Sequence, residues 1–303
     1  MNEGTTKVFI TEKYSTLIGF MGLLMWASTG TMVYYIKAIP TFQILSIVFF
    51  ISFIVGIIFS YVKKELKEVI HVPCKMWIVG FISIFGNEIF YILSYKHAPA
   101  SHVGLIYYVW PFMLIVYMSI FSVNKSFSFK YIIAGLIAFS GIYILLTDMK
   151  GVSGFKSEFS KGYLYSFLSA SLWALYTLYS KDYKNSLIPV MAIYCFCSFV
   201  CSAFIHYRTE TFVFPQTREI IIMTVLGFST YCFAYFLWSI GIKHGNINLL
   251  SLLSYTNPII STTLFVFLGV VSPSKTLLFA SALIFLSGTI GMVKFEKFKK
   301  VRS

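Results

Sequence analysis

The stretch HVGLIYYVWPFMLIV, residues His102–Val116, is apolar over almost its whole length and yet carries a proline in its middle. A proline inside a helix removes one backbone hydrogen bond and clashes with the preceding turn. Pro111 directly follows a group of large aromatic side chains, Tyr107, Tyr108 and Trp110. The stretch therefore predicts a long apolar helix that is interrupted beside aromatic residues.

The same apolar character extends over the whole chain. Hydrophobic residues make up 58% of the 303 positions and charged residues 12%, whereas a soluble domain carries about 25% charged residues. The mean hydropathy is +0.80, and a helix that spans a bilayer needs roughly 20 consecutive, mainly apolar residues. Ten segments with short loops between them meet this need and predict an all-α integral membrane protein: Tyr14–Ile36, Thr41–Tyr61, Trp77–Tyr95, Ser101–Ser122, Phe129–Leu146, Gly162–Ser180, Leu187–Tyr207, Ile220–Ile242, Asn246–Val270 and Pro273–Val293.

The net charge of +13 is unevenly distributed between the loops. If both termini are cytoplasmic and ten helices alternate, 16 of the 24 Lys and Arg residues fall on the inner face and 8 on the outer face. This bias is the positive-inside rule of multi-pass proteins of the inner (plasma) membrane. It argues against a nucleic-acid partner, and the basic tail Lys294–Ser303 is expected to meet anionic lipid headgroups.

The chain contains an internal duplication. Landmarks of the first, fourth and fifth predicted helices recur in the sixth, ninth and tenth after one constant offset of 147 positions. Because five is odd, the second copy enters the membrane from the opposite side, as in many secondary transporters. We therefore expect two inverted five-helix repeats, at 1–150 and 151–303, around a central cavity. The matching positions are Trp26 with Trp173, Tyr108 with Tyr255, Pro111 with Pro258, and Ser140 and Gly141 with Ser287 and Gly288.

The two prolines, Pro111 and Pro258, occupy equivalent places in the repeats, after YYVW and after SYTN. Interrupted helices at matching positions of two halves indicate a binding site near the membrane midplane. The alternative is that both prolines only kink their helices for packing.

Four segments resemble the drug/metabolite transporter superfamily of the EamA type, and within it the YddG-type aromatic amino acid exporters. They are NEIFYILSYKHA (Asn87–Ala98), GLIYYVWPF (Gly104–Phe112), FAYFLWSIGIKHGN (Phe233–Asn246) and LLSYTNPIIS (Leu252–Ser261). The resemblance runs from the first helix to the tenth, although Tyr107 stands where many relatives have asparagine. It implies a central cavity between the halves and export of phenylalanine, tyrosine or tryptophan. The family's motif positions fall on Glu88, Tyr108, Trp110, Pro111, Trp238, Gly241, His244, Gly245 and Asn246.

Glu88 is the only carboxylate well inside any predicted span. A carboxylate at this depth is costly and is by default functional. It could take up a proton or pair with a substrate ammonium. Alternatively, a protonated Glu88 could bond to a serine or tyrosine of another helix and hold the bundle together.

Six aromatic residues are the best candidates to line a cavity, because they lie inside spans at repeated or interrupted positions. Planar apolar side chains stack on such rings, and an ammonium group can sit over their faces. Ordinary core packing is the alternative for each of them. Ser254 and Asn257 could bind a carboxylate or an amide, and Gly241 and Gly245 are expected at helix breaks with the two prolines. The six candidates are Trp26, Tyr108, Trp110, Trp173, Trp238 and Tyr255.

Other site chemistries find no support in the sequence. Four of the five cysteines lie in apolar spans and fit packing rather than a disulfide framework or a metal site. The histidines lie at helix ends, too shallow for a proton relay. With no Walker loop and no GxSxG, we expect no cofactor, no metal and no enzymatic activity.

Three functions remain open. The first is a secondary transporter, an exporter of amino acids and most of all aromatic ones, that works by alternating access. The second is a transporter of organic cations or quaternary amines that uses Glu88 and an aromatic cage. The third is a membrane enzyme or scaffold, which would leave the duplicated interruptions unexplained. A monomer is expected, with a small molecule and the lipid bilayer as its partners.

Overall fold

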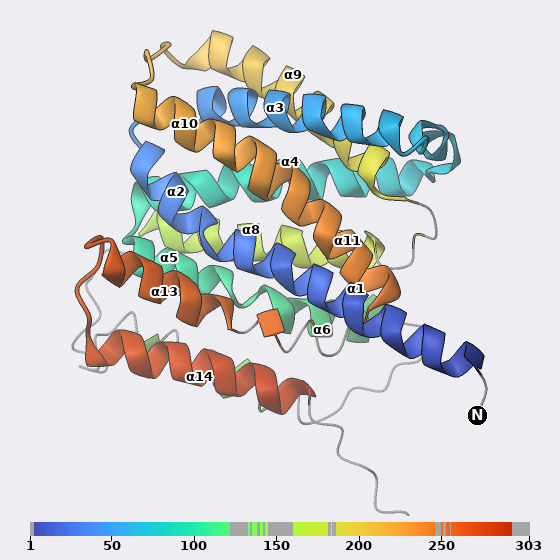
Figure 1. Cartoon of the computed structure of the whole chain (residues 1–303). Coiled ribbons are helices and arrows are strands. Elements are labelled where there is room, and N and C mark those ends of the chain that lie inside the picture. Colours follow the sequence, from blue (N-terminus) through green and yellow to red (C-terminus); the bar gives the residue numbers. More distant parts are fainter. Residues whose placement is uncertain are drawn as a thin grey trace, which may run out of the picture.

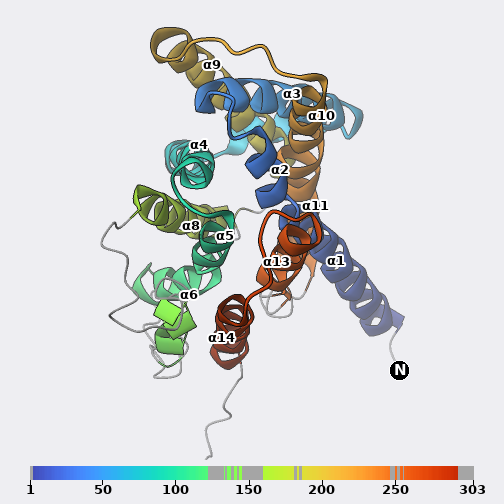
Figure 2. The same cartoon turned by 90° about the vertical axis from the view of Figure 1, so that its left-hand side faces the viewer.

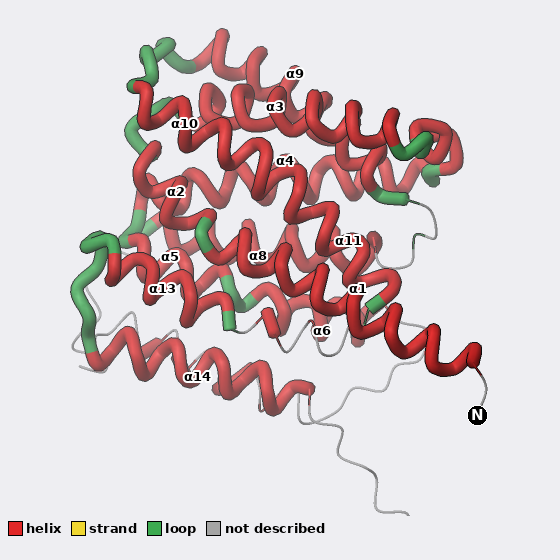
Figure 3. Tube along the Cα trace, viewed as in Figure 1, coloured by secondary structure: helices red, strands yellow, loops and turns green. Residues whose placement is uncertain are grey.

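The protein is a bundle of long helices in a computed structural model, and its described residues contain no strand (Figure 1, Figure 3). The structure describes residues 3–121, 133, 135–137, 140–141, 143–144, 160–180, 183, 186–245, 250, 253–254 and 256–292. The predicted all-helical fold is confirmed. The fifth predicted span, Phe129–Leu146, and the start of the ninth, from Asn246, lie largely outside the described residues.

The helices of the first half follow the predicted spans closely. The first span is α1 (Glu3–Ala27) with α2 (Thr29–Ile36), and the second is α3 (Thr41–Val62). A short 3-10 helix, η1 (Leu66–His71), precedes α4 (Cys74–His97). The fourth span consists of α5 (Ala100–Tyr107) and α6 (Trp110–Phe121).

The second half follows the same order. The sixth and seventh spans are α8 (Lys161–Ser180) and α9 (Ile188–Thr209). The eighth is one long rod made of α10 (Thr217–Val225), the π-helix η3 (Leu226–Phe233) and α11 (Ala234–His244). The ninth contains α13 (Asn257–Phe267), and the tenth is α14 (Lys275–Met292).

The helices pack in pairs, and each pair joins one helix of the first repeat to one helix of the second. α1 packs along α11, and its repeat counterpart α8 packs along α4, the counterpart of α11. The second and seventh spans, α3 and α9, pack against each other. Figure 2 shows α4 and α8 on one side of the bundle, α1 and α11 on the other, and α3 with α9 above them. This pattern is what a two-fold relation between the repeats produces.

The repeats run in opposite directions. Lys96 Nζ, near the end of α4, donates to the carbonyl oxygen of Ile39 after α2, 2.7 Å away. Ser160, just before α8, donates from its hydroxyl to the carbonyl oxygen of His97. The first helix of one repeat therefore ends at the face where the first helix of the other repeat begins. The duplication is inverted, as the odd number of helices in each repeat predicts.

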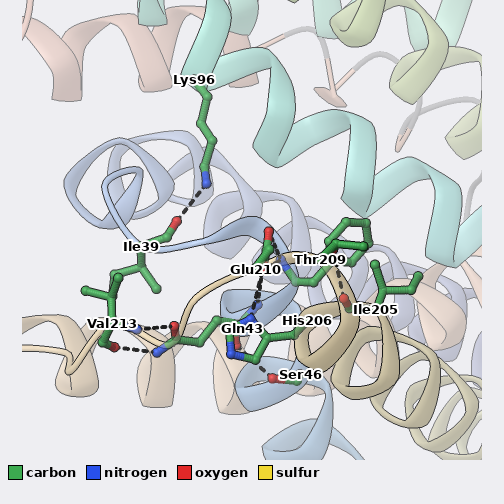
Figure 4. Close-up of polar contacts among 10 residues, drawn as sticks. Ile39, Gln43, Ser46, Lys96, Ile205, His206, Thr209, Glu210 and Val213 are labelled. Carbon is green, nitrogen blue, oxygen red and sulfur yellow. Dashed lines mark hydrogen bonds and ion pairs between the residues drawn. The ribbon is translucent and has the colours of Figure 1, made fainter.

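Polar contacts close one end of the bundle, which we call the Glu210 face (Figure 4). The Glu210 carboxylate follows α9 and accepts hydrogen bonds from the backbone N–H groups of Phe42 and Gln43, at 3.1–3.2 Å. It thus satisfies free amides at the start of α3, where the helix dipole also favours a negative charge. His206 Nδ1 lies 2.9 Å from the same carboxylate. Gln43 exchanges two hydrogen bonds with the backbone of Val213, at 2.6 and 3.0 Å.

The opposite end, which we call the Glu65 face, has a matching arrangement. The Ser186 hydroxyl, just before α9, donates to the Glu65 carboxylate after α3 over 2.6 Å. Tyr183 donates to the carbonyl oxygen of Glu68, and Lys243 at the end of α11 lies over the Tyr183 ring. In each half, an acidic residue that follows the second helix of the repeat therefore reaches the start of the equivalent helix in the other repeat.

The outer surface of the bundle is apolar. Five helical rods among the described residues are long and apolar enough to cross a membrane. Large apolar side chains on their outer faces are exposed, among them Ile58 on α3, Ile78 on α4 and Phe204 on α9. An apolar surface of this extent is what a hydrocarbon environment stabilises.

Besides the break of the ninth span before α13, three local features depart from continuous α-helices. The first span breaks at Ser28, which the sequence analysis did not predict. The fourth span breaks at Tyr108 and Val109, so that Pro111 is the second residue of α6 rather than the middle of a helix. There its missing N–H costs nothing, because the first N–H groups of a helix have no partner within the helix. The third departure is the π-helix η3.

Candidate functional site

A small cavity lies at the centre of the bundle, where the two repeats meet. It has a volume of about 40 Å³, which is room for water but not for a large side chain. Its walls come from both halves, and most of the lining side chains are aromatic. They are Leu23, Trp26, Thr29, Glu88, Tyr91, Tyr107, Tyr108, Trp110, Trp173, Thr230, Tyr235 and Asn257.

Four tryptophans form a cluster at this cavity, two from each repeat. The ring of Trp26 lies edge-on to Trp173 at 5.1 Å and to Trp238 at 5.7 Å between centroids. Trp110 lies 6.1 Å from both Trp173 and Trp238, also edge-on. Edge-to-face contacts at these distances stabilise aromatic pairs beyond their apolar area. Trp238 packs against Trp26 and Trp110 but does not belong to the lining of the cavity.

Glu88 lies at the same cavity and is 6% exposed. Three neutral groups donate hydrogen bonds to its carboxylate: the phenol of Tyr231, the phenol of Tyr235 at 3.1 Å and the amide of Asn87 at 2.7 Å. Tyr107 donates to the amide oxygen of Asn87 at 3.5 Å. We call Glu88, Asn87, Tyr231 and Tyr235 the carboxylate cluster.

The π-helix η3 contributes to the position of this cluster. A π-helix shifts the register of the residues that follow it and leaves carbonyl groups for other partners. Ser52 of α3 donates to the carbonyl oxygen of Gly227 at 2.8 Å, and Trp26 Nε1 donates to that of Thr230 at 3.1 Å. The first repeat thus satisfies the carbonyl groups of η3. Tyr231 belongs to η3 itself, and Tyr235 lies in the first turn of α11.

Two buried oxygen atoms of the lining have no hydrogen-bond partner among the described residues. They are Thr29 Oγ1, beside the break of the first span, and Asn257 Oδ1, at the start of α13. The amide nitrogen of Asn257 donates to the carbonyl oxygen of Leu23 at 3.1 Å, which fixes the side chain in place. Buried polar groups are nearly always paired. These two oxygens therefore indicate a place for a polar ligand or for water.

The remaining residues named by the sequence analysis lie around this centre. Tyr108, in the break of the fourth span, shares a hydrogen bond of 3.0 Å with Ser261 of α13. Ser254 is fully buried before α13, whereas Tyr255 lies outside the described residues. Pro258 is in the first turn of α13, as Pro111 is in that of α6. The interrupted fourth and ninth helices therefore contact each other at the site.

Gly241 and Gly245 allow close packing between α1 and the end of α11. A Cβ on Gly241 would lie 2.6 Å from the Cα of Gly19, and one on Gly245 would lie 2.8 Å from the backbone N of Thr16. Small residues allow such close approach of helices in membranes. Gly241 lies within α11 and is not at a helix break, whereas Gly245 is the residue at which α11 ends.

Several lining residues were missing from the sequence analysis, chiefly Tyr91, Tyr107, Tyr235, Thr29 and Thr230. The sequence does contain one indication of Tyr235. This residue lies 147 positions after Glu88, at the offset that relates the two repeats. Within the described part of the chain, no group of three or more His, Cys, Asp or Glu side chains could hold a metal ion.

Known proteins share this architecture. The profile of the EamA-like transporter family matches residues 13–147 and again 160–292. The aromatic amino acid exporter YddG of Ancylobacter novellus is 32% identical over 270 residues, which cover 89% of this chain and 94% of the relative. The exporter of the same name from Salmonella typhimurium is 25% identical and covers 84% and 88%. One solved crystal structure, 28% identical, superposes with a TM-score of 0.73 and covers 92% of this chain and 96% of that chain.

Proposed function

The chain belongs to the EamA-like transporter family, and from this premise we propose that it exports aromatic amino acids by alternating access. The observation that carries the proposal is the central cavity. It brings four tryptophans, a buried carboxylate and two unpaired oxygens together where the repeats meet. The relatives named as aromatic amino acid exporters support the same substrate class.

Each part of the cavity has a counterpart in an aromatic amino acid. The rings of Trp26, Trp110 and Trp173 offer faces and edges on which a planar apolar side chain stacks. Glu88 offers a negative charge and Asn257 Oδ1 an acceptor to the ammonium group, and the hydroxyl groups of Tyr108 and Thr29 offer donors to the carboxylate end. Ser254 and Trp238 are proposed as supporting residues next to this lining, and Tyr255, outside the described residues, stays a candidate from the sequence.

The cavity of about 40 Å³ is too small for tryptophan. Binding requires the aromatic rings to separate, which the interrupted first, fourth and ninth helices allow, since a helix break moves more easily than a continuous helix.

We place the protein in the inner (plasma) membrane as a multi-pass transporter. We also propose that both termini are cytoplasmic, that it acts as a monomer and that it is not an enzyme. In this orientation the Glu65 face is cytoplasmic and the Glu210 face is outside. The two five-helix units, 1–150 and 151–303, would then rock against each other around the cavity.

Flux measured in proteoliposomes tests the proposal. The purified protein is reconstituted, and counterflow of labelled phenylalanine, tyrosine and tryptophan is compared with that of leucine, glutamate and a quaternary amine. We expect counterflow of the three aromatic amino acids above that of empty vesicles and of the other compounds. Transport of the quaternary amine alone would favour the organic-cation function and contradict ours.

A further inference from the structure

Glu88 and Tyr235 are equivalent residues of the two repeats. They are 147 positions apart, as Trp26 and Trp173 are, and they form a hydrogen bond of 3.1 Å. Equivalent residues of two related halves touch each other only beside the two-fold axis that relates the halves. When inverted repeats exchange conformations, access to the centre switches from one face to the other, but a group on the axis stays in place.

The carboxylate on this axis has only neutral partners among the described residues. Tyr231 and Tyr235 belong to η3 and α11, Asn87 belongs to α4, and each donates a hydrogen bond. The other titratable groups near Glu88 are Tyr107 of α5 and Cys195 of α9, and neither brings a positive charge. A charged carboxylate without a counter-charge is costly inside a membrane. Glu88 therefore needs either a proton or a cationic group of a ligand.

Glu88 also lies between two cavities. The central cavity is on one side of the carboxylate cluster. A second cavity of about 20 Å³ is lined by Tyr231, Tyr235, Ser52, Cys195 and Ser239 and extends to Leu187 and Ile188 at the start of α9. These last residues adjoin Ser186 on the Glu65 face. Tyr235 lines both cavities, so the carboxylate cluster lies between the proposed substrate site and a second, mostly apolar pocket that extends toward the Glu65 face.

We propose that Glu88 couples transport to protons by binding either one proton or the ammonium group of the substrate. This inference rests on the proposed function and extends it to an exchange of one proton for one amino acid. When the amino acid binds, the carboxyl proton leaves to the solution on that side, and the carboxylate pairs with the ammonium group. After release on the other side, a proton from that side takes its place. The phenols of Tyr231 and Tyr235 keep their protons and position the carboxylate.

The proposed exchange is electrogenic. An amino acid with one ammonium and one carboxylate group carries no net charge, whereas the proton that moves the other way carries one. Each cycle therefore moves one positive charge across the membrane, opposite to the substrate. An inward proton gradient, or a membrane potential negative inside, should drive export.

The wild-type protein in proteoliposomes tests the coupling directly. A pH-sensitive dye is trapped inside, and labelled tryptophan is allowed to run out along its gradient. We expect the interior to acidify by one proton for each tryptophan lost. Tryptophan efflux at constant internal pH would overturn this inference and leave the proposed function standing. The absence of any tryptophan flux would overturn the proposed function itself.

Variants of Glu88 assign the coupling to the carboxylate. Glu88→Gln should elute as the folded protein does and should lose proton movement, while Glu88→Asp should retain part of it. Unchanged proton movement in Glu88→Gln would contradict the assignment. If Glu88→Gln leaves flux and its pH dependence unchanged while Glu88→Ala unfolds the protein, Glu88 only holds the bundle together.

Variants of the two tyrosines test their positioning role. Tyr231→Phe and Tyr235→Phe each remove one donor from the charged form of Glu88. They should move the pH at which tryptophan flux is half-maximal upward. Tyr194→Phe is the matched control, because the buried phenol of Tyr194 bonds to the carbonyl oxygen of Met76 at 2.7 Å and lines neither cavity. Equal shifts in all three variants would show a structural effect and contradict the role.

Discussion

Trp110 is the residue at which an aromatic substrate and a cationic substrate can best be distinguished. It follows the break of the fourth span, lines the central cavity and contacts Trp173 and Trp238 edge-on. An apolar side chain that stacks on Trp110 would lose contact area if the ring were removed. A cation over the ring would depend on its electrons instead, and tryptophan binds cations more strongly than phenylalanine does.

The first prediction concerns substitutions of Trp110 and Trp238. Replacing either with Ala should remove about 1–3 kcal/mol of apolar contact, a loss of about 5- to 150-fold in tryptophan affinity. Trp110→Phe should retain most of the affinity for tryptophan. Substitution of Trp238 is expected to reduce the affinity less than substitution of Trp110, because Trp238 does not line the cavity. Binding of tryptophan to the purified variants measures both effects.

The control is Trp77 of α4, which packs edge-on against Tyr194 at 5.4 Å and does not line the cavity. Trp77→Phe should leave affinity unchanged. A quaternary amine serves as the second probe. If Trp110→Phe weakened the amine strongly and tryptophan hardly at all, the ring would bind both classes. If the affinities for tryptophan and for the amine were both unchanged in Trp110→Phe and Trp110→Ala, the substrate would not contact the Trp110 ring.

Sequence reasoning predicted about half of the cavity lining, and its limits are physical. Trp26, Trp173 and Tyr108 were found because the duplication marks them, and Glu88 because a lone carboxylate in an apolar span is conspicuous. The partners of Glu88 were not found. Tyr231 is oriented by a π-helix, and the sequence contains no proline or polar break that would indicate one.

At the scale of helices, the contact between α1 and α11 depends on glycine. Gly19 and Gly241 face each other so closely that a Cβ on Gly241 would lie 2.6 Å from the Cα of Gly19. This contact pairs the first helix of one repeat with the third helix of the other. Its repeat counterpart, between α8 and α4, is held differently, by hydrogen bonds of 2.9 Å from Ser169 to Asn87.

The second prediction is that Gly241→Ala destabilises the protein. The added methyl group forces α1 and α11 apart, and overpacking of this kind costs about 1–3 kcal/mol. Gly104→Ala in α5 is the control, because its Cβ would meet nothing closer than 3.9 Å and alanine favours a helix. Thermal unfolding in detergent should show a lower midpoint for Gly241→Ala only. A midpoint at or above that of the wild type would contradict the close contact.

The contacts at the Glu210 face join the two repeats, since Glu210 follows α9 and receives N–H groups of α3. The sequence gives little indication of such a cap, because the acceptor is 168 residues away from the first amide that it satisfies. Local cap signals in the sequence precede a helix directly, as Gln216 precedes α10.

The third prediction follows from this long-range cap. Glu210→Ala should destabilise the folded state by about 1–2 kcal/mol, since it removes both the cap and the charge that complements the helix dipole. Thr209→Ala is the control, because the Thr209 hydroxyl bonds only to the carbonyl oxygen of Ile205 in its own helix. Thermal unfolding of both variants measures the difference. Equal midpoints would mean that water replaces the carboxylate at no cost.

At the scale of the molecule, the fold and the two interruptions marked by proline were predictable, whereas the break at Ser28 and the π-helix η3 were not. Span lengths and the constant offset of 147 positions indicate ten helices in two halves, and an odd number of helices per half dictates inversion. The break at Ser28 has no proline, and its repeat counterpart lies in the continuous helix α8. Local propensity therefore does not account for the break at Ser28, unlike the breaks before Pro111 and Pro258.

The two faces of the molecule differ in charge, and this difference leads to the last prediction. Lys63 and Lys64 precede η1, Lys67 lies in it and Lys75 follows it, and all four lie with Lys243 at the Glu65 face. The positive-inside rule predicts that this face lies in the cytoplasm. The first half of α1 reaches the same face, because Thr16 adjoins Gly245 at the end of α11. Both termini are then cytoplasmic if the number of spans is even.

The chain carries its own probe for this orientation. Cys74, the first residue of α4, is exposed at the Glu65 face, whereas Cys195 is buried and Cys197, Cys201 and Cys232 are partly buried within spans. A membrane-impermeant thiol reagent should therefore label Cys74 only after the cells are permeabilised. As the control, Thr211→Cys in a Cys74→Ser background places a thiol at the exposed Glu210 face and should react in intact cells. Labelling of Cys74 in intact cells, with protection of the cysteine at position 211, would reverse the orientation. It would then place the second cavity on the outer side.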